Sequence, residues 1–177
     1  ITDDLRILDC SYPCSGSTSI LLASENIASK FSDQPVWISG IGQKTNSASF
    51  AKNEFTELTT SIIASRDAYK MAKISANDID VAEIHDAFTV CELMAVKDLG
   101  FSENISGADY VRNLFNTENR KINPRGGLIG AGHPLGATGI AQIMEITTQL
   151  QNKAKKRQVD VANKGLIHNM SAAATSS

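Results

Sequence analysis

A glycine-rich stretch at residues 126–139 constrains the fold of this chain more than any other feature. It contains six of the chain's 12 glycines and has His133-Pro134 near its centre. Proline fixes its own φ and holds the preceding residue in an extended conformation, while glycine lets a backbone approach a ligand closely. Because a helical pattern follows, we expect a tight loop with a histidine at its tip, opening a helix whose free N–H groups can face an anion or a developing oxyanion. The alternative is a turn that serves packing alone.

Two familiar phosphate-binding motifs are excluded by position. A P-loop needs Lys-Ser/Thr after its second glycine, but His133-Pro134 follows Gly132 here, which leaves no positive charge for the phosphates. A dinucleotide fingerprint needs a third glycine at the place that Leu135 occupies. We therefore expect neither kind of nucleotide site in this loop.

Short apolar runs alternate with helical patterns along the rest of the chain. The runs predicted as strands are residues 19–23, 35–41, 81–84 and 165–168. The patterns predicted as helices are residues 24–31, 57–73, a helix between Asp86 and Gly100, 109–116 and 140–150, with 42–55 as a loop. This alternation predicts an α/β domain built in layers.

Individual residues refine these elements. Ser24 and Asp86 stand where side chains cap helix starts, and Gly100 stands where a left-handed residue ends a helix. The basic run 153–157 is expected to be a solvated helix end that complements the macrodipole. The side chains expected to face the core are Phe88, Cys91, Met94 and Ala95 in one helix, and Ile140, Ile143, Met144, Ile146 and Leu150 in another.

Composition excludes several classes of protein. The chain has 177 residues, 42% hydrophobic and 20% charged, which is a globular composition. A net charge of −2 offers no basic excess for nucleic acid, and no apolar stretch approaches the ~20 residues of a membrane helix. Three cysteines without a pairing pattern, Cys10, Cys14 and Cys91, fit a reducing cytoplasm. No secretory signal opens the chain, and its first residue is Ile1, so we expect a fragment.

The three histidines all fall at predicted strand ends or at the loop tip. His85 follows residues 81–84 and His168 ends residues 165–168, and open α/β sheets bind ligands at the carboxyl ends of their strands. For a lone histidine, a core position bonded to its neighbours is the commoner outcome. Spacings of 48 and 35 residues match no local metal-ligand pattern, so metal binding is only a weak alternative.

Three motifs together resemble those of thiolases. The stretch from Asn123-Pro124-Arg125 through His133-Pro134 to Gly139 resembles the Gly-His-Pro region of that family. His85-Asp86-Ala87-Phe88 resembles the Asn-Glu-Ala-Phe motif, in the form that sterol-carrier-protein-type and archaeal acetoacetyl-CoA thiolases carry. His168-Asn169 stands where thiolases with two catalytic cysteines have the second one. The resemblance runs from about Leu5 to Met170 and implies the C-terminal half of a thiolase fold, a mixed β-sheet covered by helices on both sides.

The resemblance also implies a chemistry, the reversible Claisen condensation or thiolysis of acyl-CoA thioesters. His133 would accept the proton of a nucleophilic thiol and then donate to the thioester oxygen, and His85 would help to stabilise the enolate oxygen. His168 takes the position of the acid/base cysteine. Gly132, Phe88 and Asn169 are expected beside the substrate, with no metal and no cofactor besides the coenzyme A of the substrate.

The family's nucleophilic cysteine lies in its N-terminal half, and none of the cysteines here occupies a matching motif. The implied partners are therefore that N-terminal half, acyl-CoA or coenzyme A, a second copy in a homo-oligomer, and a possible complex with a hydroxymethylglutaryl-CoA synthase. A cytoplasmic enzyme of lipid metabolism, in the mevalonate pathway, is implied with them. The expected division is a domain over residues 1–170 and an irregular Ser/Ala tail over 171–177.

The sequence departs from the family pattern at two further places. Ser15-Gly16-Ser17-Thr18 replaces a segment resembling Asp-Gly-Ala-Ala, and residues 171–177 replace a glycine-rich turn and a final strand. Alanines adopt positive φ at a cost, and a missing strand leaves an exposed sheet edge. The altered tail, together with the missing nucleophilic cysteine, favours an alternative function, a non-catalytic thiolase-like protein that binds coenzyme A or lipid or acts as a scaffold.

Overall fold

A small parallel sheet lies at the centre of the fold. The computed structural model describes residues 1–53, 55–117, 120–171 and 175–177. Strand β1 (Val81–Glu83) pairs with β2 (Gly165–Ile167), with Ala82 opposite Leu166. On the other edge of β1, Ile122 forms a parallel bridge with Ala82, so the chain after residue 120 adds a short third row.

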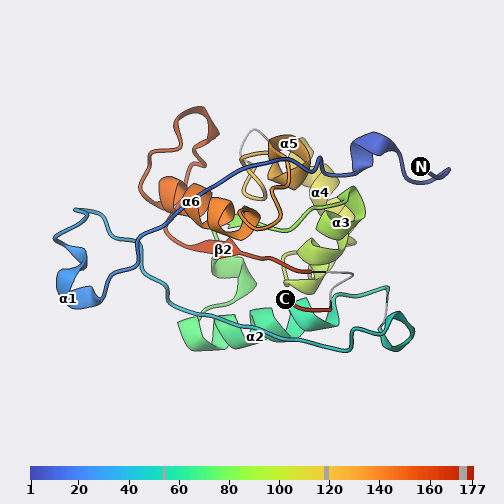
Figure 1. The fold of residues 1–177 in the computed structure, drawn as a ribbon, viewed down its shortest axis with the longest axis horizontal. Helices are drawn as coiled ribbons and strands as arrows, with labels where there is room; N and C mark the ends of the chain where they lie inside the picture. The colour runs from blue at the N-terminus through green and yellow to red at the C-terminus, as the bar shows by residue number, and fades with distance from the viewer. Residues whose placement is uncertain (54, 118–119, 172–174) are drawn as a thin grey trace.

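Helices surround this sheet in layers (Figure 1). In chain order the elements are η1 (Ile7–Asp9), α1 (Glu25–Ala28), η2 (Phe50–Lys52), α2 (Thr59–Ala72), η3 (Ala76–Asp78), β1, α3 (Thr89–Asp98), α4 (Gly107–Phe115), α5 (Gly127–Ala131), α6 (Thr138–Leu150), η4 (Lys155–Arg157) and β2. Helix α6 contacts both strands, while α3 packs against α2 and α4. The layered α/β architecture expected from the alternation of elements is confirmed.

Side chains along β1 point alternately to the two faces of the sheet and contribute to two separate parts of the buried core. Val81 points toward α6 and packs with Ile146 and residues that precede β2. Ala82 points the other way, into a larger cluster with residues of α3 such as Val96. Successive side chains of a strand point to opposite faces, so Glu83 lies on the α6 side and Ile84 on the α3 side. The two residues after Ile84, His85 and Asp86, leave the strand at its carboxyl end.

Most elements with a strong local pattern lie where the sequence predicts them. Helices α2, α3, α4 and α6 and both strands agree with the predicted ranges to within a few residues. Gly100 has φ +88 and follows α3 as the predicted left-handed residue. Helix α1 is shorter than predicted, with four residues, and the hydroxyl of Ser24 makes no capping hydrogen bond at its start.

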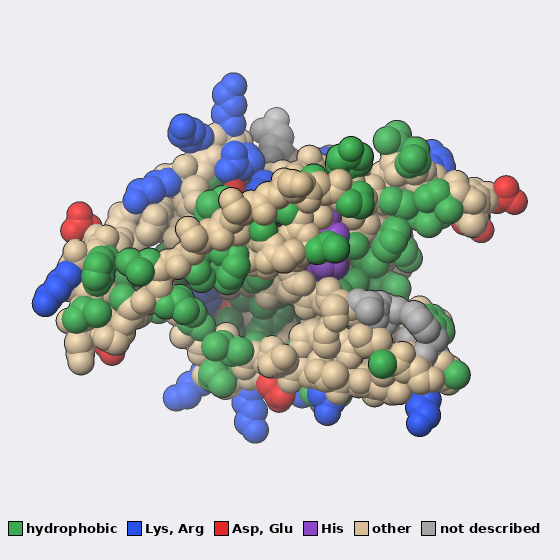
Figure 2. Space-filling view, in the orientation of Figure 1, with side chains coloured by type: hydrophobic (Ala, Val, Ile, Leu, Met, Phe, Trp, Pro, Cys, Tyr) green, Lys and Arg blue, Asp and Glu red, His purple; other side chains and the backbone are tan. Residues whose placement is uncertain are grey.

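The strands predicted at 19–23 and 35–41 are wrong. Within the described residues neither stretch forms a strand or a bridge with another segment. Their apolar side chains are exposed, with Leu21 71% and Ile38 66% accessible. Figure 2 shows hydrophobic side chains gathered along this outer part of the molecule. A β-branched run forms a strand only where a neighbour offers hydrogen-bonding partners, which local pattern does not reveal.

The face of α6 that meets the sheet is also different from the one predicted. Its buried residues are Thr138, Gln142, Glu145, Ile146 and Gln149, whereas Met144 is 48% exposed. The polar members are buried because they have partners: Gln142 Nε2 donates to the His168 carbonyl over 3.3 Å, and Gln149 Nε2 donates to the Arg157 carbonyl over 2.7 Å. Hydrogen bonds therefore override the apolar stripe, and of the five residues expected inside only Ile146 is buried.

The start of α3 corrects two further expectations. Its N-cap is Phe88, without a side-chain capping bond, so Asp86 does not cap this helix. Phe88 itself is 44% exposed rather than buried, and Cys91 and Met94 are only partly buried, while Ala95 is buried as expected.

The tail expected to be irregular makes backbone contacts at its described ends. Ser176 forms antiparallel bridges with Thr45 and with Ser171, and the amide of Lys44 donates to the Ser177 carbonyl over 2.7 Å. Residues 172–174 lie outside the described residues. Across the described part of the chain, every helix is too short or too polar to cross a lipid bilayer.

Candidate active site

Two of the three histidines meet at the carboxyl end of β1. His85 follows β1, and His133 comes from the loop between α5 and α6. Their ring centroids are 5.2 Å apart and the ring planes cross at 84°, so one ring meets the other edge-on. The two histidines predicted to share a site are therefore neighbours, although 48 residues separate them in the sequence.

An N-terminal segment that carries no recognised motif holds both histidine loops in place. Cys10 bridges Phe88, and the amide of Ser11 donates to the Ala87 carbonyl over 2.8 Å. At the next residue, the Tyr12 carbonyl accepts from the His133 amide over 2.8 Å. The segment thus fastens the loop after β1 to the Gly-His-Pro loop. Sequence reasoning missed this role because backbone groups, which every residue has, make the contacts.

The hydrogen bonds of His133 determine which of its ring nitrogens is free. Its Nδ1 lies 2.7 Å from Thr138 Oγ1, and that hydroxyl donates to the Pro134 carbonyl over 3.2 Å. Since the hydroxyl proton is used on Pro134, Thr138 accepts from His133, which assigns the ring proton to Nδ1. Nε2 is then the unprotonated nitrogen that can accept a proton. Burial lowers the pKa of His133, which keeps this ring neutral.

His85 is a buried, neutral imidazole, and one of its nitrogens has no partner within the part of the chain that the structure describes. The residue is 6% exposed, and its Nδ1 makes no hydrogen bond among the described residues. Burial, and then the neighbouring His133, lower the pKa of His85 to about 4, although a hydrogen bond with the Asn169 side chain acts in the opposite direction. Asn169 in turn donates to Gln142 Oε1 over 3.0 Å, so α6 orients the amide that meets His85.

His168 lies behind His85 and is bonded on both sides of its ring. Its Nδ1 is 3.5 Å from the His85 backbone N–H, and its Nε2 is 2.9 Å from Ser61 Oγ on α2. An acceptor at Nδ1 leaves the proton on Nε2, which then donates to Ser61. Burial, reinforced by His85, lowers the pKa of His168 to about 3. The ring thus ties α2 to the end of the sheet, and its acid/base role stays a prediction.

Asp86 links the loop after β1 to the loop of His133. Its carboxylate accepts from the Leu128 amide at the start of α5 over 2.6 Å, so it caps α5 rather than α3. Burial raises the pKa of Asp86, while the amides of Leu128 and Ile129 oppose this shift. Gly127 has φ +63, and a Cβ there would collide with the Asp86 carboxylate. The Asp86 side chain, next to His85, therefore fixes the start of α5, and α5 leads into the loop that carries His133.

The remaining predicted residues lie around this pair. Gly132 has φ +83, and a Cβ on it would come within 2.7 Å of Cys14 Sγ, so glycine is required for the close approach. Phe88 is partly exposed beside Cys10 at the outer end of the loop after β1. A shallow, open groove runs past Pro134 and is lined by residues 14–18 and 134–137. It borders the Gly-His-Pro loop, and its lining residues include none of the three histidines.

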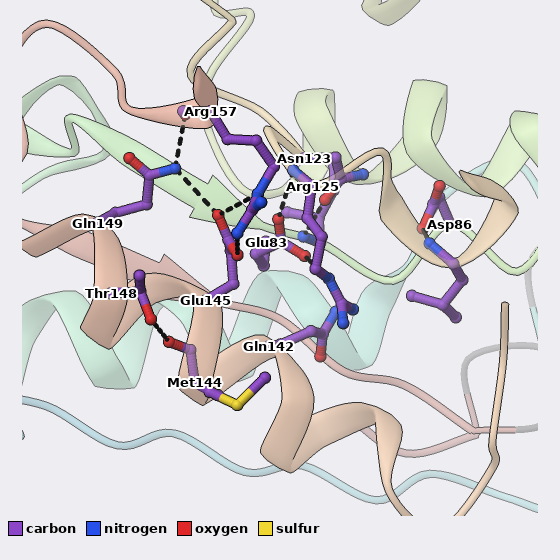
Figure 3. Close-up of polar contacts among 12 residues, drawn as sticks. Glu83, Asp86, Asn123, Arg125, Gln142, Met144, Glu145, Thr148, Gln149 and Arg157 are labelled. Atoms are coloured by element: carbon purple, nitrogen blue, oxygen red, sulfur yellow. Dashed lines mark hydrogen bonds and ion pairs between the residues drawn. The ribbon is translucent and has the colours of Figure 1, made fainter. Parts of the chain in front are cut away.

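A cluster of buried charges lies next to the site, between β1 and α6 (Figure 3). Glu83 is fully buried and its Oε2 is 3.7 Å from Arg125 Nε, while Glu145 Oε2 is 2.9 Å from Arg157 Nη2. Burial raises the pKa of Glu83 to about 7 against the opposing charge of Arg125. Arg157 is thus paired with a buried carboxylate, which corrects the expectation that the basic run is only a solvated helix end. The described residues contain no group of three or more His, Cys, Asp or Glu side chains that could hold a metal ion.

Comparison with known families supplies the identity of this arrangement. Residues 42–177 match the family model described as Thiolase C-terminal domain-like. The chain belongs to this thiolase family. The match includes the loop after β1, the Gly-His-Pro loop and the end of β2, which are the segments that carry the three histidines.

Relatives agree with the thiolase assignment over nearly the whole chain. The sequence is 39% identical to an acetyl-CoA acetyltransferase of Methanothermobacter thermautotrophicus over 173 residues, covering 96% of this chain and 45% of the relative. It is 38% identical to human sterol carrier protein 2, covering 96% of this chain and 32% of that protein. A solved structure titled Ltp2-ChsH2(DUF35) aldolase superposes with a TM-score of 0.74 at 18% identity, covering 94% of this chain and 44% of the other, and supports the fold alone. The chain thus spans less than half the length of each of these relatives.

In this thiolase domain the motif residues lie together as expected, whereas the side chains that bond to them were not predicted from the sequence. His85, His133 and Asn169 come together, with His168 directly behind His85. Sequence reasoning missed Thr138 and Ser61, the side chains that bond His133 and His168. Thr138 could have been found, because it lies five residues after His133 at the start of the helix predicted to follow the loop. Nothing in the sequence pattern of α2 distinguishes Ser61 from its neighbours.

Proposed function

We propose that this domain supplies the acid/base and oxyanion groups of a thiolase reaction, the reversible condensation or thiolysis of acyl-CoA thioesters. The observation that carries the proposal is the pair of His85 and His133, both neutral, with His133 Nε2 left unprotonated by the Thr138 hydrogen bond. A neutral imidazole can take the proton of a thiol and return it later, and a thiolate is the form that attacks a thioester.

In the proposed reaction, a cysteine from the N-terminal half of the complete protein is the nucleophile. His133 Nε2 accepts the thiol proton, the sulfur attacks the thioester carbonyl, and the coenzyme A thiolate leaves with the proton that His133 gives back. In the condensation direction a base of the complete site takes an α-proton from a second acetyl-CoA, and a donor from His85 stabilises the negative charge on the enolate oxygen. A fixed donor aimed at such an oxygen is typically worth about 10²–10³ in rate. The enolate carbon then attacks the carbonyl of the acetylated cysteine, and the cysteine thiolate leaves.

The proposal extends to the setting of the domain. The substrate is a coenzyme A thioester with no further cofactor, and residues 1–170 form the domain that binds it together with an N-terminal thiolase half. The exposed apolar side chains of residues 20–41 favour such a neighbour, because large exposed apolar patches mark interaction surfaces. The finer assignments, a cytoplasmic homodimer in the mevalonate pathway with a possible hydroxymethylglutaryl-CoA synthase complex, belong to the same proposal.

A second candidate is a non-catalytic thiolase-like protein that binds coenzyme A or lipid. Two observations favour it: relatives carry the names sterol carrier protein 2 and Non-specific lipid-transfer protein-like 2, and Cys10, Cys14 and Cys91 occupy no nucleophile motif. A cysteine in the nucleophile motif of the complete reading frame separates the two candidates at once.

Kinetics on the complete protein test the catalytic proposal. His133→Ala should lower kcat for acetoacetyl-CoA thiolysis by about 10²–10⁴, the usual worth of a general base, with little change in melting temperature. His85→Ala should give a smaller loss, concentrated in the condensation direction. Leu135→Ala, on the same loop with a side chain that is 78% exposed, is the matched control and should be neutral. If His133 only packs, its variant lowers the melting temperature and keeps near-normal turnover, and the proposal fails.

The isolated chain offers a second test. Without the nucleophile it should show no thiolysis above a heat-treated control. Turnover by residues 1–177 alone would mean that one of its own cysteines attacks the thioester, and the role given to the N-terminal half would be wrong.

A further inference from the structure

The parallel ladder on the outer edge of β1 ends in an unusual way at Asn123. Ala82 N donates to the Lys121 carbonyl and Asn123 N donates to the Ala82 carbonyl, each over 2.8 Å, as in a parallel pair. The next donor along this edge is the amide of Ile84, the residue that follows β1. Its expected partner is the carbonyl of Asn123, but that carbonyl accepts from the Gly126 amide over 2.8 Å instead. Asn123 has φ +49, so the chain has already turned away from the strand.

The side chain of Asn123 takes the place of the missing carbonyl. Its Oδ1 accepts from the Ile84 amide over 2.8 Å, and its Nδ2 donates to Glu92 Oε2 on α3 over 2.9 Å. The residue is 7% exposed, and both ends of its amide are used. One side chain therefore joins the end of β1, the Asn-Pro-Arg turn and α3.

Asparagine suits this position because three requirements coincide. A left-handed φ favours glycine and asparagine or aspartate, the Ile84 amide needs an acceptor, and the Glu92 carboxylate needs a donor. Glycine meets only the first requirement and aspartate only the first two. The local chemistry thus selects the one residue that has the backbone tolerance, the acceptor and the donor together.

The residue that follows Ile84 is His85, and one nitrogen of its ring, Nδ1, makes no hydrogen bond among the described residues. The ring meets the edge of His133 and the Asn169 amide. With Nδ1 unbonded, the backbone that precedes His85 has a direct share in setting the direction of the ring. We propose that Asn123 is the positioning residue for His85, acting through the Ile84 amide and anchored by Glu92. Its effect on turnover rests on the proposed function, whereas its effect on the geometry of His85 does not.

Reversing the polarity of the Asn123–Glu92 contact tests this in the complete protein. Asn123→Asp keeps the acceptor for Ile84 but places two carboxylates in contact, so kcat should fall about 10- to 10²-fold, the cost of a displaced catalytic group, while KM for the thioester stays near its original value. Adding Glu92→Gln gives a donor opposite the new carboxylate, so N123D/E92Q should recover most of the loss. Asn116→Asp, at an exposed asparagine after α4, is the matched control.

The pH profile gives a readout that a general loss of stability would not produce. Two carboxylates in contact share a proton as the pH falls, because ionising both is unfavourable. The turnover of N123D relative to the original protein should therefore rise on acidification, and that of N123D/E92Q should not. The other charged groups beside Glu92 are Asp86 and Arg120, which are the same in all variants.

Crystal structures of the variants separate this inference from the proposed function. In N123D the ring of His85 should move from its position 5.2 Å from His133, and in the double variant it should return. An unmoved His85 ring in N123D, or a double variant without recovery, overturns the positioning role. A displaced ring with unchanged turnover leaves the positioning role in place and refutes the catalytic role of His85 instead. Should N123D fail to fold, Glu92→Gln alone, which weakens the anchor but keeps the Ile84 bond, should give a smaller displacement and a smaller loss.

Discussion

Asp86 offers the most direct test of how the two histidine loops are coupled. Its carboxylate accepts from the amide of Leu128 over 2.6 Å and from that of Ile129, and Leu128 is fully buried. Asp86→Ala leaves these donors without a partner. Each of the two lost bonds to a charged acceptor is worth roughly 1.5–3 kcal/mol, so we expect the free energy of unfolding to fall by about 3–6 kcal/mol.

Asp86→Asn should behave very differently. The amide keeps one oxygen that can accept from Leu128, and it replaces the other oxygen and the negative charge with an NH2 group. Burial raises the pKa of Asp86, which means that the folded protein disfavours the ionised form. Removing the charge should therefore cost less than about 1 kcal/mol, below the usual cost of leaving a buried donor unpaired.

Urea unfolding of the two variants at pH 7, followed by circular dichroism, measures this difference. Asp67→Asn, at an exposed position of α2, is the control for the loss of one negative charge. Equal losses in Asp86→Ala and Asp86→Asn would refute the reasoning, because the charge rather than the accepted hydrogen bonds would then stabilise α5. In the complete protein only Asp86→Ala should also lower kcat, since α5 leads into His133.

Three further predictions concern other parts of the domain. The pKa of Glu83 is about 7 in the folded protein and near 4.5 in the unfolded chain, so only the folded state holds this proton between the two values. Glu83 therefore makes the free energy of unfolding fall with rising pH by about 1.4 kcal/mol per pH unit. Glu83→Gln should remove this slope in urea unfolding between pH 5 and pH 7, and an unchanged slope contradicts the raised pKa. Thr138→Val removes the acceptor for His133 Nδ1 and should lower kcat about tenfold, as expected for weakened general-base catalysis, whereas Thr138→Ser should keep the activity. Equal activity of the two variants would contradict the claim that Thr138 holds the ring proton of His133 on Nδ1. Gly42 contacts the backbone of α2 at Ala64, so Gly42→Ala should cost about 1–3 kcal/mol in unfolding free energy by overpacking, whereas Gly136→Ala, with open space around it, should be neutral.

Several parts of the fold were accessible from local sequence pattern. Helices α2 and α4 and the glycine-rich loop follow from periodicity and from residues with special backbone preferences, because such preferences act within a few residues. The motifs around His85, His133 and His168 predicted a shared site at strand ends. In the structure the three residues form a chain of contacts, from His168 to His85 and from His85 to His133.

Other parts depended on contacts between distant segments. The stretches 19–23 and 35–41 have strand-like composition but no partner within the described residues, and a strand exists only in a pair. The buried face of α6 is polar because Gln142 and Gln149 find carbonyls that lie far away in the sequence or beyond the helix end. Local hydrophobicity does not contain that information.

The sequence by itself determined the family, the layered α/β class and the identity of the three histidines, since these rest on residue types at set spacings. Only the tertiary structure decided the protonation, the hydrogen-bond partners and the orientation of those histidines. It assigned the proton of His133 through Thr138, enclosed His168 against Ser61, and made Asp86 the cap of α5 instead of α3. Protonation and orientation depend on which donor or acceptor lies within about 3 Å and on how far water is excluded, and both are set by the packing of elements that are remote in sequence.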